Sequence, residues 1–394
     1  MRDVHTALDS ATQLWGELER VSSTTELLDA AHNLWCGPRC DEGPGCPFLH
    51  YPRTRPPDAP PRSPASRYTR RTAELFGLMG GGYQPGTPQV HELCLWPLLR
   101  ESITSTDAGA TAELDYTDWS KKHAASATEL CRYICRDVVQ WMALWCGDRY
   151  DIQPAAVHYV ALTSIVDDLC IPPLDLVTGR FRLYERSAAD LAVALDAQGW
   201  GRHGVHAMLA MVRQYLLQYA EKTHQALHPR LNDLESVWDA VIYRTYTANT
   251  YGAAIAIEQV CGQVCDLDEI TWTWRMDSAI CDAISMDLAK TAALDIYHVE
   301  NHQPTAHGQH ARRRETGYHS LYLDLIADLV ATGAPDPLVH FGRSGFLFVP
   351  LVERYPERRH GRRHPLRPAM QARLHDLFGD TPADPHIDHA FKPE

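Results

Sequence analysis

The chain contains 394 residues, which is enough for one large helical domain or two ordinary ones. Its 37 basic and 50 acidic residues give a formal net charge of −13, which argues against nucleic-acid binding through the general surface. No apolar run reaches the length of about 18 residues that a membrane-spanning helix needs, so we expect no stable membrane insertion. Residues 1–18 lack the apolar core of a secretory signal, and most of the 11 cysteines lie in apolar helical patterns. We therefore expect reduced thiols and a cytoplasmic location.

Helical periodicity recurs along the chain, and alternating β patterns are nearly absent. Pro154 and the almost wholly apolar segment 155–166 predict a helix that is buried on all sides. Residues 234–258 predict another helix, with Gly252 as a candidate break. The remaining predicted helices, in chain order, lie within residues 4–35, 124–145, 203–227, 268–300, 317–331 and 336–355. The predicted fold class is therefore all-α.

Composition suggests three parts of the chain. Residues 51–71 are dense in Pro and Arg, so residues 1–85 are predicted to form an N-terminal helical and Pro-Arg-rich extension that is partly mobile. Residues 86–360 carry the continuous series of helical patterns and are predicted to form the main α-helical domain. Residues 361–394 combine Arg and His clusters with Pro-rich polar sequence and are predicted to be a poorly ordered tail.

A short segment near the start of the chain is rich in potential metal ligands. Cys36, Cys40, Cys46 and His50 lie within fifteen residues, and zinc needs four such ligands in tetrahedral arrangement. The spacing from Cys40 to His50 matches that of CCCH zinc fingers, whereas the spacing from Cys36 to Cys40 is shorter than in those fingers. The sequence leaves open whether these residues bind zinc or lie in a loop with incidental cysteines.

Two adjacent carboxylates, Asp167 and Asp168, end the predicted buried helix. Burying them unpaired would be costly, so they either face solvent at the helix end or face a cavity where a divalent cation neutralises them. Asp175 lies beyond two prolines and is a weak third ligand. Cys170 stands where a third hard ligand is expected, and a thiol is a poor magnesium ligand.

Arg244 is a single arginine in an apolar helical run. Such an arginine either pairs with a core acid or binds a phosphate through its two-pronged guanidinium. Arg354 and Tyr355 lie together at the end of the last predicted helix, where an arginine is also favoured by the helix dipole.

Asp287, Thr291 and Asp295 are spaced four residues apart, so in a helix their oxygen-bearing side chains lie on one face. Such a face offers three oxygens to a hard cation, although it also occurs as a solvated helix edge. The same helix contains an alternative set, Asp282 and Ser285. The two sets are offset by about 140° around the helix axis, so they cannot both face one ligand.

The order and spacing of these motifs resemble class I terpene synthases, most closely the trichodiene-synthase-like branch. The resemblance covers residues 118–358. The chain departs from the family pattern in both metal motifs. The first motif lacks its usual later acid. In the second motif, Asp295 stands where the family usually has Glu, and Leu288 stands where a second acid would follow Asp287. The resemblance implies a class I helical bundle around a central cavity, with the N-terminal extension outside it.

The resemblance also implies a mechanism and a set of site residues. We expect three Mg²⁺ ions, a prenyl diphosphate substrate with farnesyl diphosphate favoured, and cyclisation to a sesquiterpene with release of diphosphate. A homodimer is the candidate assembly. Residues 247–249 lie where members of the family have a break in a helix that meets the substrate. The implied metal ligands are Asp167, Asp168, Asp287, Thr291 and Asp295. The implied catalytic residues are Arg244, Arg354 and Tyr355, and the implied substrate-binding residues are Arg244, Trp141, Tyr159, Tyr215, Tyr243 and Thr247.

Other functions remain open at this point. A prenyltransferase would use the same metal site with a second acceptor in the pocket. A non-catalytic helical binding protein would retain the bundle with metal motifs that no longer bind metal. A nucleic-acid-binding or partner-binding protein would rely on the cysteine-rich segment and the Arg-rich arm, but the acidic composition counts against it.

Overall fold

A computed structural model gives the structure of residues 4–40, 46–49, 99–100, 134, 137–139, 141–142, 145–146, 153–169, 171–183, 185–223, 237–294 and 321–348. Within these ranges the only β-type pairing is an isolated bridge between Leu183 and Arg186, so the prediction of an all-α fold is confirmed. The helices with assigned bounds are α1 (Ala11–Leu18), α2 (Thr24–Cys36), α7 (Pro154–Leu169), α8 (Pro173–Val177), α9 (Ala188–Ala197), α10 (Arg202–Thr223), α12 (Val237–Thr247), α13 (Thr250–Val260), α14 (Glu269–Leu294) and α17 (Asp336–Phe348). Residues 321–331 form a further helix.

Polar residues define where several of these helices begin. Ser10 and Ser23 precede α1 and α2, and each side chain accepts a hydrogen bond from a backbone N–H of the first turn. Ser187 and Asp190 form a reciprocal capping box at the start of α9. These caps satisfy backbone donors that the helix itself leaves without a partner.

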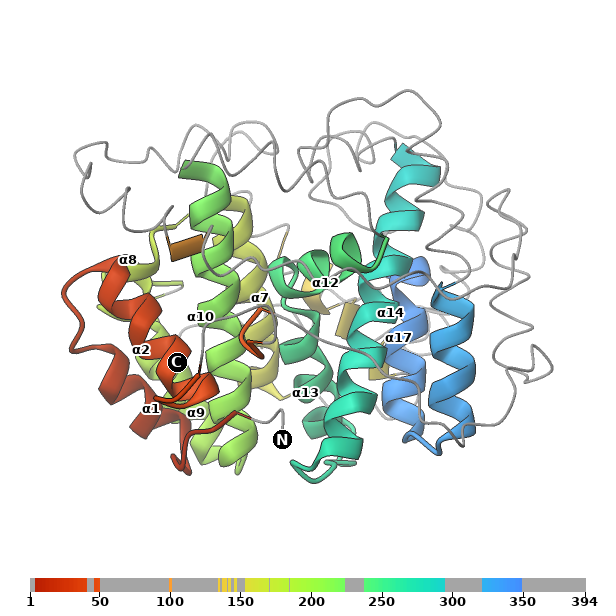
Figure 1. Ribbon diagram of the computed structural model, residues 1–394, viewed down its shortest axis with the longest axis horizontal. Helices are drawn as coiled ribbons and strands as arrows, with labels where there is room; N and C mark the ends of the chain where they lie inside the picture. Colours follow the sequence, from red (N-terminus) through yellow and green to blue (C-terminus); the bar gives the residue numbers. More distant parts are fainter. Residues whose placement is uncertain are drawn as a thin grey trace.

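Helices α7, α10, α13, α14 and α17 lie side by side in the body of the molecule (Figure 1). The Gln153 side chain, just before α7, donates to the carbonyl of Gln259 near the end of α13. His203, in the first turn of α10, and Arg275 near the start of α14 both contact the carbonyl of Cys265. Helices α7, α10 and α14 therefore start at the end of the bundle where α13 finishes. We call this the basal end, and the opposite end the apical end.

The basal end holds a fully buried ion pair between α13 and α14. The Nε atom of Arg275 lies 2.6 Å from Oε2 of Glu258, and both side chains are 0% exposed. A second nitrogen of Arg275 donates to the Cys265 carbonyl at 2.7 Å. Because both charges are shielded from water, each depends on the other for compensation.

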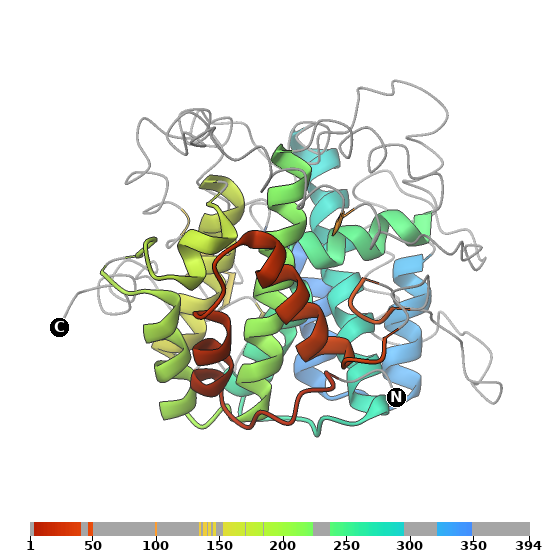
Figure 2. The same ribbon diagram turned by 60° about the vertical axis from the view of Figure 1, so that its left-hand side comes forward.

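The N-terminal helices pack against the same core. Asp196, near the end of α9, accepts hydrogen bonds from the backbone of Ala11 and Thr12 and so fixes the start of α1. Trp15 of α1 and Trp35 of α2 are buried. Figure 2 shows these two helices lying across α9 and α10. The division of the chain into the parts 1–85, 86–360 and 361–394 stays a prediction.

The structure changes one detail of the predicted helix 234–258. The break lies at Asn249, between α12 and α13, and Gly252 lies inside α13. The prediction of a break at Gly252 was wrong, whereas the expectation of a break near residues 247–249 is confirmed. None of the helices that the structure describes has the length and apolar character needed to cross a membrane.

Candidate active site

The break between α12 and α13 is the local feature that positions Arg244. Asn249 adopts a left-handed conformation (φ 50°), which asparagine tolerates better than most side chains. Its backbone N–H donates to the Tyr246 carbonyl at 3.2 Å, and the chain then enters α13. In Figure 2, α12 crosses the bundle while the neighbouring helices run along it. The break therefore gives α12 a direction of its own near the apical end.

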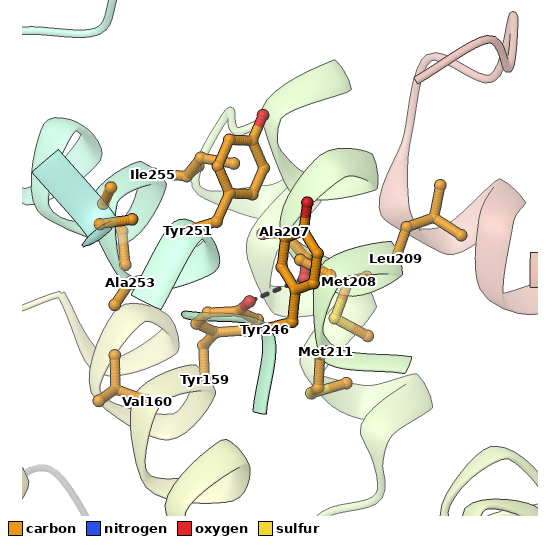
Figure 3. Packing of buried hydrophobic residues seen from close by; sticks show 14 of the residues in the cluster. Tyr159, Val160, Ala207, Met208, Leu209, Met211, Tyr246, Tyr251, Ala253 and Ile255 are labelled. Carbon is orange, nitrogen blue, oxygen red and sulfur yellow. Dashed lines mark hydrogen bonds between the residues drawn. The ribbon is translucent and has the colours of Figure 1, made fainter. Parts of the chain in front are cut away.

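Tyr159 of α7 holds this break in place, and Figure 3 shows its hydroxyl directed toward Ala207 of α10. Its hydroxyl donates to the carbonyl of Ala207 on α10 at 2.7 Å and accepts from the side-chain amide of Asn249 at 2.8 Å. Gly252 leaves the space for that hydroxyl, because a Cβ there would lie 1.9 Å from it. Burial raises the pKa of the Tyr159 phenol, so it remains a neutral donor. Its predicted contact with substrate stays a prediction.

Arg244 lies in the last turn of α12 and is half-buried. Its carbonyl accepts hydrogen bonds from the Ala248 N–H at 2.9 Å and the Thr247 hydroxyl at 3.3 Å. The Thr247 carbonyl in turn accepts from the side chain of Gln218 on α10 at 2.6 Å. The end of α12 is therefore tied to α10, which limits the positions open to Arg244. Tyr243, also half-buried, precedes Arg244 on α12.

The predicted metal motifs lie on helices that run toward the same end of the bundle. Asp167 and Asp168 occupy the last turn of α7, whose apical direction follows from the contact of Gln153 at the basal end. Asp287 and Thr291 lie in the second half of α14, which Figure 1 shows extending past α12. Only the backbone is described at these four positions. Asp295, Arg354 and Tyr355 lie outside the described residues, as does His50.

The alternative set on α14 lies in a densely packed region. Asp282 and Ser285 are both 0% exposed, and the Ser285 hydroxyl donates to the Asp282 carbonyl. Ser278, two turns before Ser285 on the same face, donates its hydroxyl to the carbonyl of Leu338 on α17. At 100° per residue, Ser285 lies on the face that meets α17, and Asp287 lies about 180° from Ser278.

The predicted aromatic residues take part in core packing. Trp141 packs against Trp145 with the rings tilted by 47° and their centroids 4.2 Å apart, and Trp145 meets Phe341 edge-on at 4.7 Å. The Tyr215 hydroxyl donates to the carbonyl of Leu162 on α7 at 3.2 Å. These contacts join α7, α10 and α17 to the core; whether the rings also face a substrate stays a prediction, as does the central cavity.

Sequence reasoning missed two residues that position the site. Gln218 ties α10 to the end of α12, and Arg213, one turn and a half earlier on α10, lies with its guanidinium 3.8 Å from the ring centroid of Tyr246 on α12. In the sequence, each of these residues is a polar side chain within an apolar helical pattern. Residues that face solvent give the same pattern, so it does not identify a residue that positions a site.

The alpha-humulene synthase family model matches residues 124–386. The chain is 31% identical over 267 residues to an alpha-humulene synthase of Phoma sp., a match that covers 67% of this chain and 68% of that protein. It is 27% identical over 251 residues to an alpha-humulene synthase of Sarocladium schorii, covering 62% of this chain and 57% of that protein.

The helical bundle, the order of its motifs and these matches define a class I terpene synthase, so the predicted resemblance and the prediction of a lyase are confirmed. Within that class, the chain belongs to the alpha-humulene synthase family.

Proposed function

We propose that this enzyme ionises farnesyl diphosphate in a magnesium-dependent reaction and cyclises the fifteen-carbon chain to a sesquiterpene with release of diphosphate. The observation that carries the proposal is the family match over residues 124–386, which includes Asp167, Arg244 and Asp287. Both curated relatives are named for alpha-humulene, a fifteen-carbon hydrocarbon, and this favours farnesyl diphosphate over shorter and longer substrates. Alpha-humulene is the first product to seek.

The available donor set suits magnesium. Asp167 and Asp168 on α7, Asp287 and Thr291 on α14, and Asp295, which follows α14 in the sequence, offer carboxylate and hydroxyl oxygens, which hard cations prefer. We propose that these residues hold three ions. Magnesium held there would supply positive charge to neutralise the diphosphate as its bond to carbon breaks. The packing of Ser278 against α17 supports Asp287 over the alternative set, because helix geometry turns Asp287 away from that contact.

The chain's own residues bind and orient the diphosphate. Arg244 would donate two parallel hydrogen bonds to its oxygens, since a guanidinium matches that geometry. Arg354 and the Tyr355 hydroxyl would donate hydrogen bonds to the same group. The hydrogen bonds from these donors would strengthen as negative charge develops on the leaving group. Because they are strongest in the transition state, they would lower the barrier to ionisation.

The aromatic residues would protect the carbocation that remains. Water would quench it, so a dry pocket is required. We propose that Trp141, Tyr159, Tyr215 and Tyr243 contribute to its lining, where each ring face would stabilise a cation by about 0.5–2 kcal/mol.

The proposal is tested by offering the purified protein geranyl, farnesyl and geranylgeranyl diphosphate with magnesium and analysing volatile products by gas chromatography and mass spectrometry. We expect a cyclic sesquiterpene from farnesyl diphosphate. Product only when a second acceptor is added would identify a prenyltransferase. Absence of product from all three substrates would contradict the proposal and favour a non-catalytic binding protein. Light scattering on the same sample tests the proposed homodimer.

A further inference from the structure

The strongest feature outside the proposed active site is a cluster of three thiols and an imidazole beneath the N-terminal helices. His32, Cys36, Cys40 and Cys46 each offer one ligand atom, and these atoms all lie within 4.8 Å of one another. The cluster draws its imidazole from His32, inside α2, whereas the sequence pattern pointed to His50.

Local structure explains how these residues meet. His32 and Cys36 are four residues apart in α2, so their side chains lie on one face. Gly37 ends the helix with a φ of 80°, and the Cys40 N–H then donates to the Gly37 carbonyl, which turns the chain back toward the helix end. Cys46 approaches from the 46–49 turn, which is closed by a hydrogen bond from the Leu49 N–H to the Cys46 carbonyl.

Two of the distances between ligand atoms are close to those of a tetrahedral zinc site. Around zinc, two thiolate sulfurs lie about 3.8 Å apart, and a sulfur and an imidazole nitrogen lie about 3.6 Å apart. The Cys36 and Cys46 sulfurs are 3.6 Å apart, and the Cys46 sulfur is 3.3 Å from Nε2 of His32. A disulfide needs a sulfur–sulfur distance of about 2.05 Å, so the two thiols are separate.

Burial favours a metal over four unmetallated groups. His32 and Cys46 are 3% and 2% exposed, whereas Cys36 and Cys40 are half-buried. Thiols are weak hydrogen-bond partners, so they would satisfy a buried imidazole poorly. Sulfur ligands select zinc over magnesium, so this cluster would not compete for the ions of the active site.

A buried positive charge beside the cluster is a second, independent observation. Arg213 of α10 is 2% exposed, and among the described residues it makes no ion pair. It donates to the Phe48 carbonyl at 3.1 Å, and its guanidinium lies over the rings of Trp35 and Tyr246. A zinc ion with three thiolates and one imidazole carries a net charge of about −1. Such a site would compensate the guanidinium, which is otherwise costly to bury.

We propose that His32, Cys36, Cys40 and Cys46 bind one structural zinc ion. All four positions are filled by protein ligands, which is the arrangement of structural rather than catalytic sites. The ion would fasten the 46–49 turn to the end of α2, and through Phe48 and Arg213 it would support Tyr246 on α12, two residues from Arg244. The proposal does not depend on the terpene synthase reaction.

Metal analysis tests the proposal directly. The chain is purified without chelator from zinc-supplemented cells, and zinc is measured by mass spectrometry. We expect about one zinc ion per chain, and X-ray absorption should give three sulfurs at about 2.3 Å and one nitrogen at about 2.0–2.1 Å. Absence of zinc, or a Cys36–Cys46 disulfide in freshly purified reduced protein, would overturn it.

Two matched variants assign the nitrogen ligand. His50→Ala should keep its zinc and its nitrogen ligand, whereas His32→Ala should lose at least about tenfold in zinc content. The His50→Ala result decides the assignment even if His32→Ala does not fold. Cys40→Ser should lose zinc, while Cys261→Ser, which changes a half-buried thiol outside the cluster, should retain it. Loss of zinc in His50→Ala with the fold intact would contradict the ligand set.

Discussion

At the residue scale, the geometry around Arg244 depends on contacts within the protein among Tyr159, Asn249 and Gly252. Asn249 turns the chain, the Tyr159 hydroxyl bonds to its amide, and Gly252 leaves room for that hydroxyl. The position of each of these residues depends on contacts with the other two. A change in one of them should therefore alter the direction of α12.

Gly252→Ala should destabilise the protein, because its Cβ would lie 1.9 Å from the Tyr159 hydroxyl and force α13 or α7 to shift. Overpacking of this kind costs about 1–3 kcal/mol. The matched control is Gly16→Ala in α1, where nothing lies within 4 Å and alanine should stabilise the helix by about 0.5–1 kcal/mol. Urea unfolding measures both. Equal stability of Gly252→Ala and the unchanged protein would contradict the packing described here.

Arg244→Lys should separate charge from geometry. Lysine retains the positive charge but cannot form two parallel hydrogen bonds, so we expect kcat/KM for farnesyl diphosphate to fall by about 10–100-fold. Arg180→Lys, at an exposed arginine after α8, should leave kcat/KM unchanged. Unaltered turnover in Arg244→Lys would remove Arg244 from the proposed diphosphate site.

At the element scale, contacts between helices transmit position from one part of the bundle to another. Trp35 on α2, Arg213 on α10 and Tyr246 on α12 stack in succession and connect the N-terminal helices to the helix of Arg244. The basal ion pair joins α13 to α14 in a similar way. The sequence predicts residues 1–85 as an extension. In the structure, α2 from this part of the chain lies next to Arg213, whose side chain contacts α12.

The basal ion pair should show strong coupling between its two partners. Arg275→Met alone leaves the Glu258 carboxylate buried and should cost about 3–5 kcal/mol. The double variant Glu258→Leu with Arg275→Met leaves neither charge uncompensated, so it should be more stable than that single variant. Denaturant unfolding of both single variants and the double variant gives the coupling free energy. If the stability losses of the two single variants simply add up in the double variant, the two side chains are not coupled and the ion pair indicated by their distance would be contradicted.

At the scale of the whole molecule, the sequence predicts the architecture better than the details of the site. Periodicity located α7 within a few residues, because a buried helix needs apolar side chains on all faces. The break at Asn249 depends on Tyr159, ninety positions away in the chain, and local patterns contain no record of such a contact. His32 was missed as a partner of the cysteines for a different, local reason: motif spacing favours His50, whereas the helix presents His32 beside Cys36.

Buried histidines should make the whole molecule sensitive to acid. Burial lowers the pKa of His158 to about 4 and that of His206 to about 3, both from 6.5. Below pH 6.5 the unfolded chain therefore binds more protons than the folded chain. The contribution of these histidines to the free energy of unfolding is fully present above pH 6.5 and is lost as the pH falls. We expect a loss of about 1.4 kcal/mol per histidine for each pH unit below 6.5, until the folded pKa is reached.

Urea unfolding between pH 7 and pH 5 measures this loss. The double variant His158→Asn with His206→Asn should show a shallower dependence on pH than the unchanged chain. Equal slopes in the two proteins would assign the acid sensitivity to other groups.

The central claim is that aspartates on α7 and α14 act together on a prenyl diphosphate. The most direct test measures diphosphate release and volatile product from farnesyl diphosphate, with and without magnesium, in the unchanged chain and in Asp167→Ala and Asp287→Ala. We predict magnesium-dependent formation of a cyclic sesquiterpene, and a loss of at least about a hundredfold in each variant with little change in Tm. Full turnover without a divalent cation, or full activity in either variant, would contradict the account.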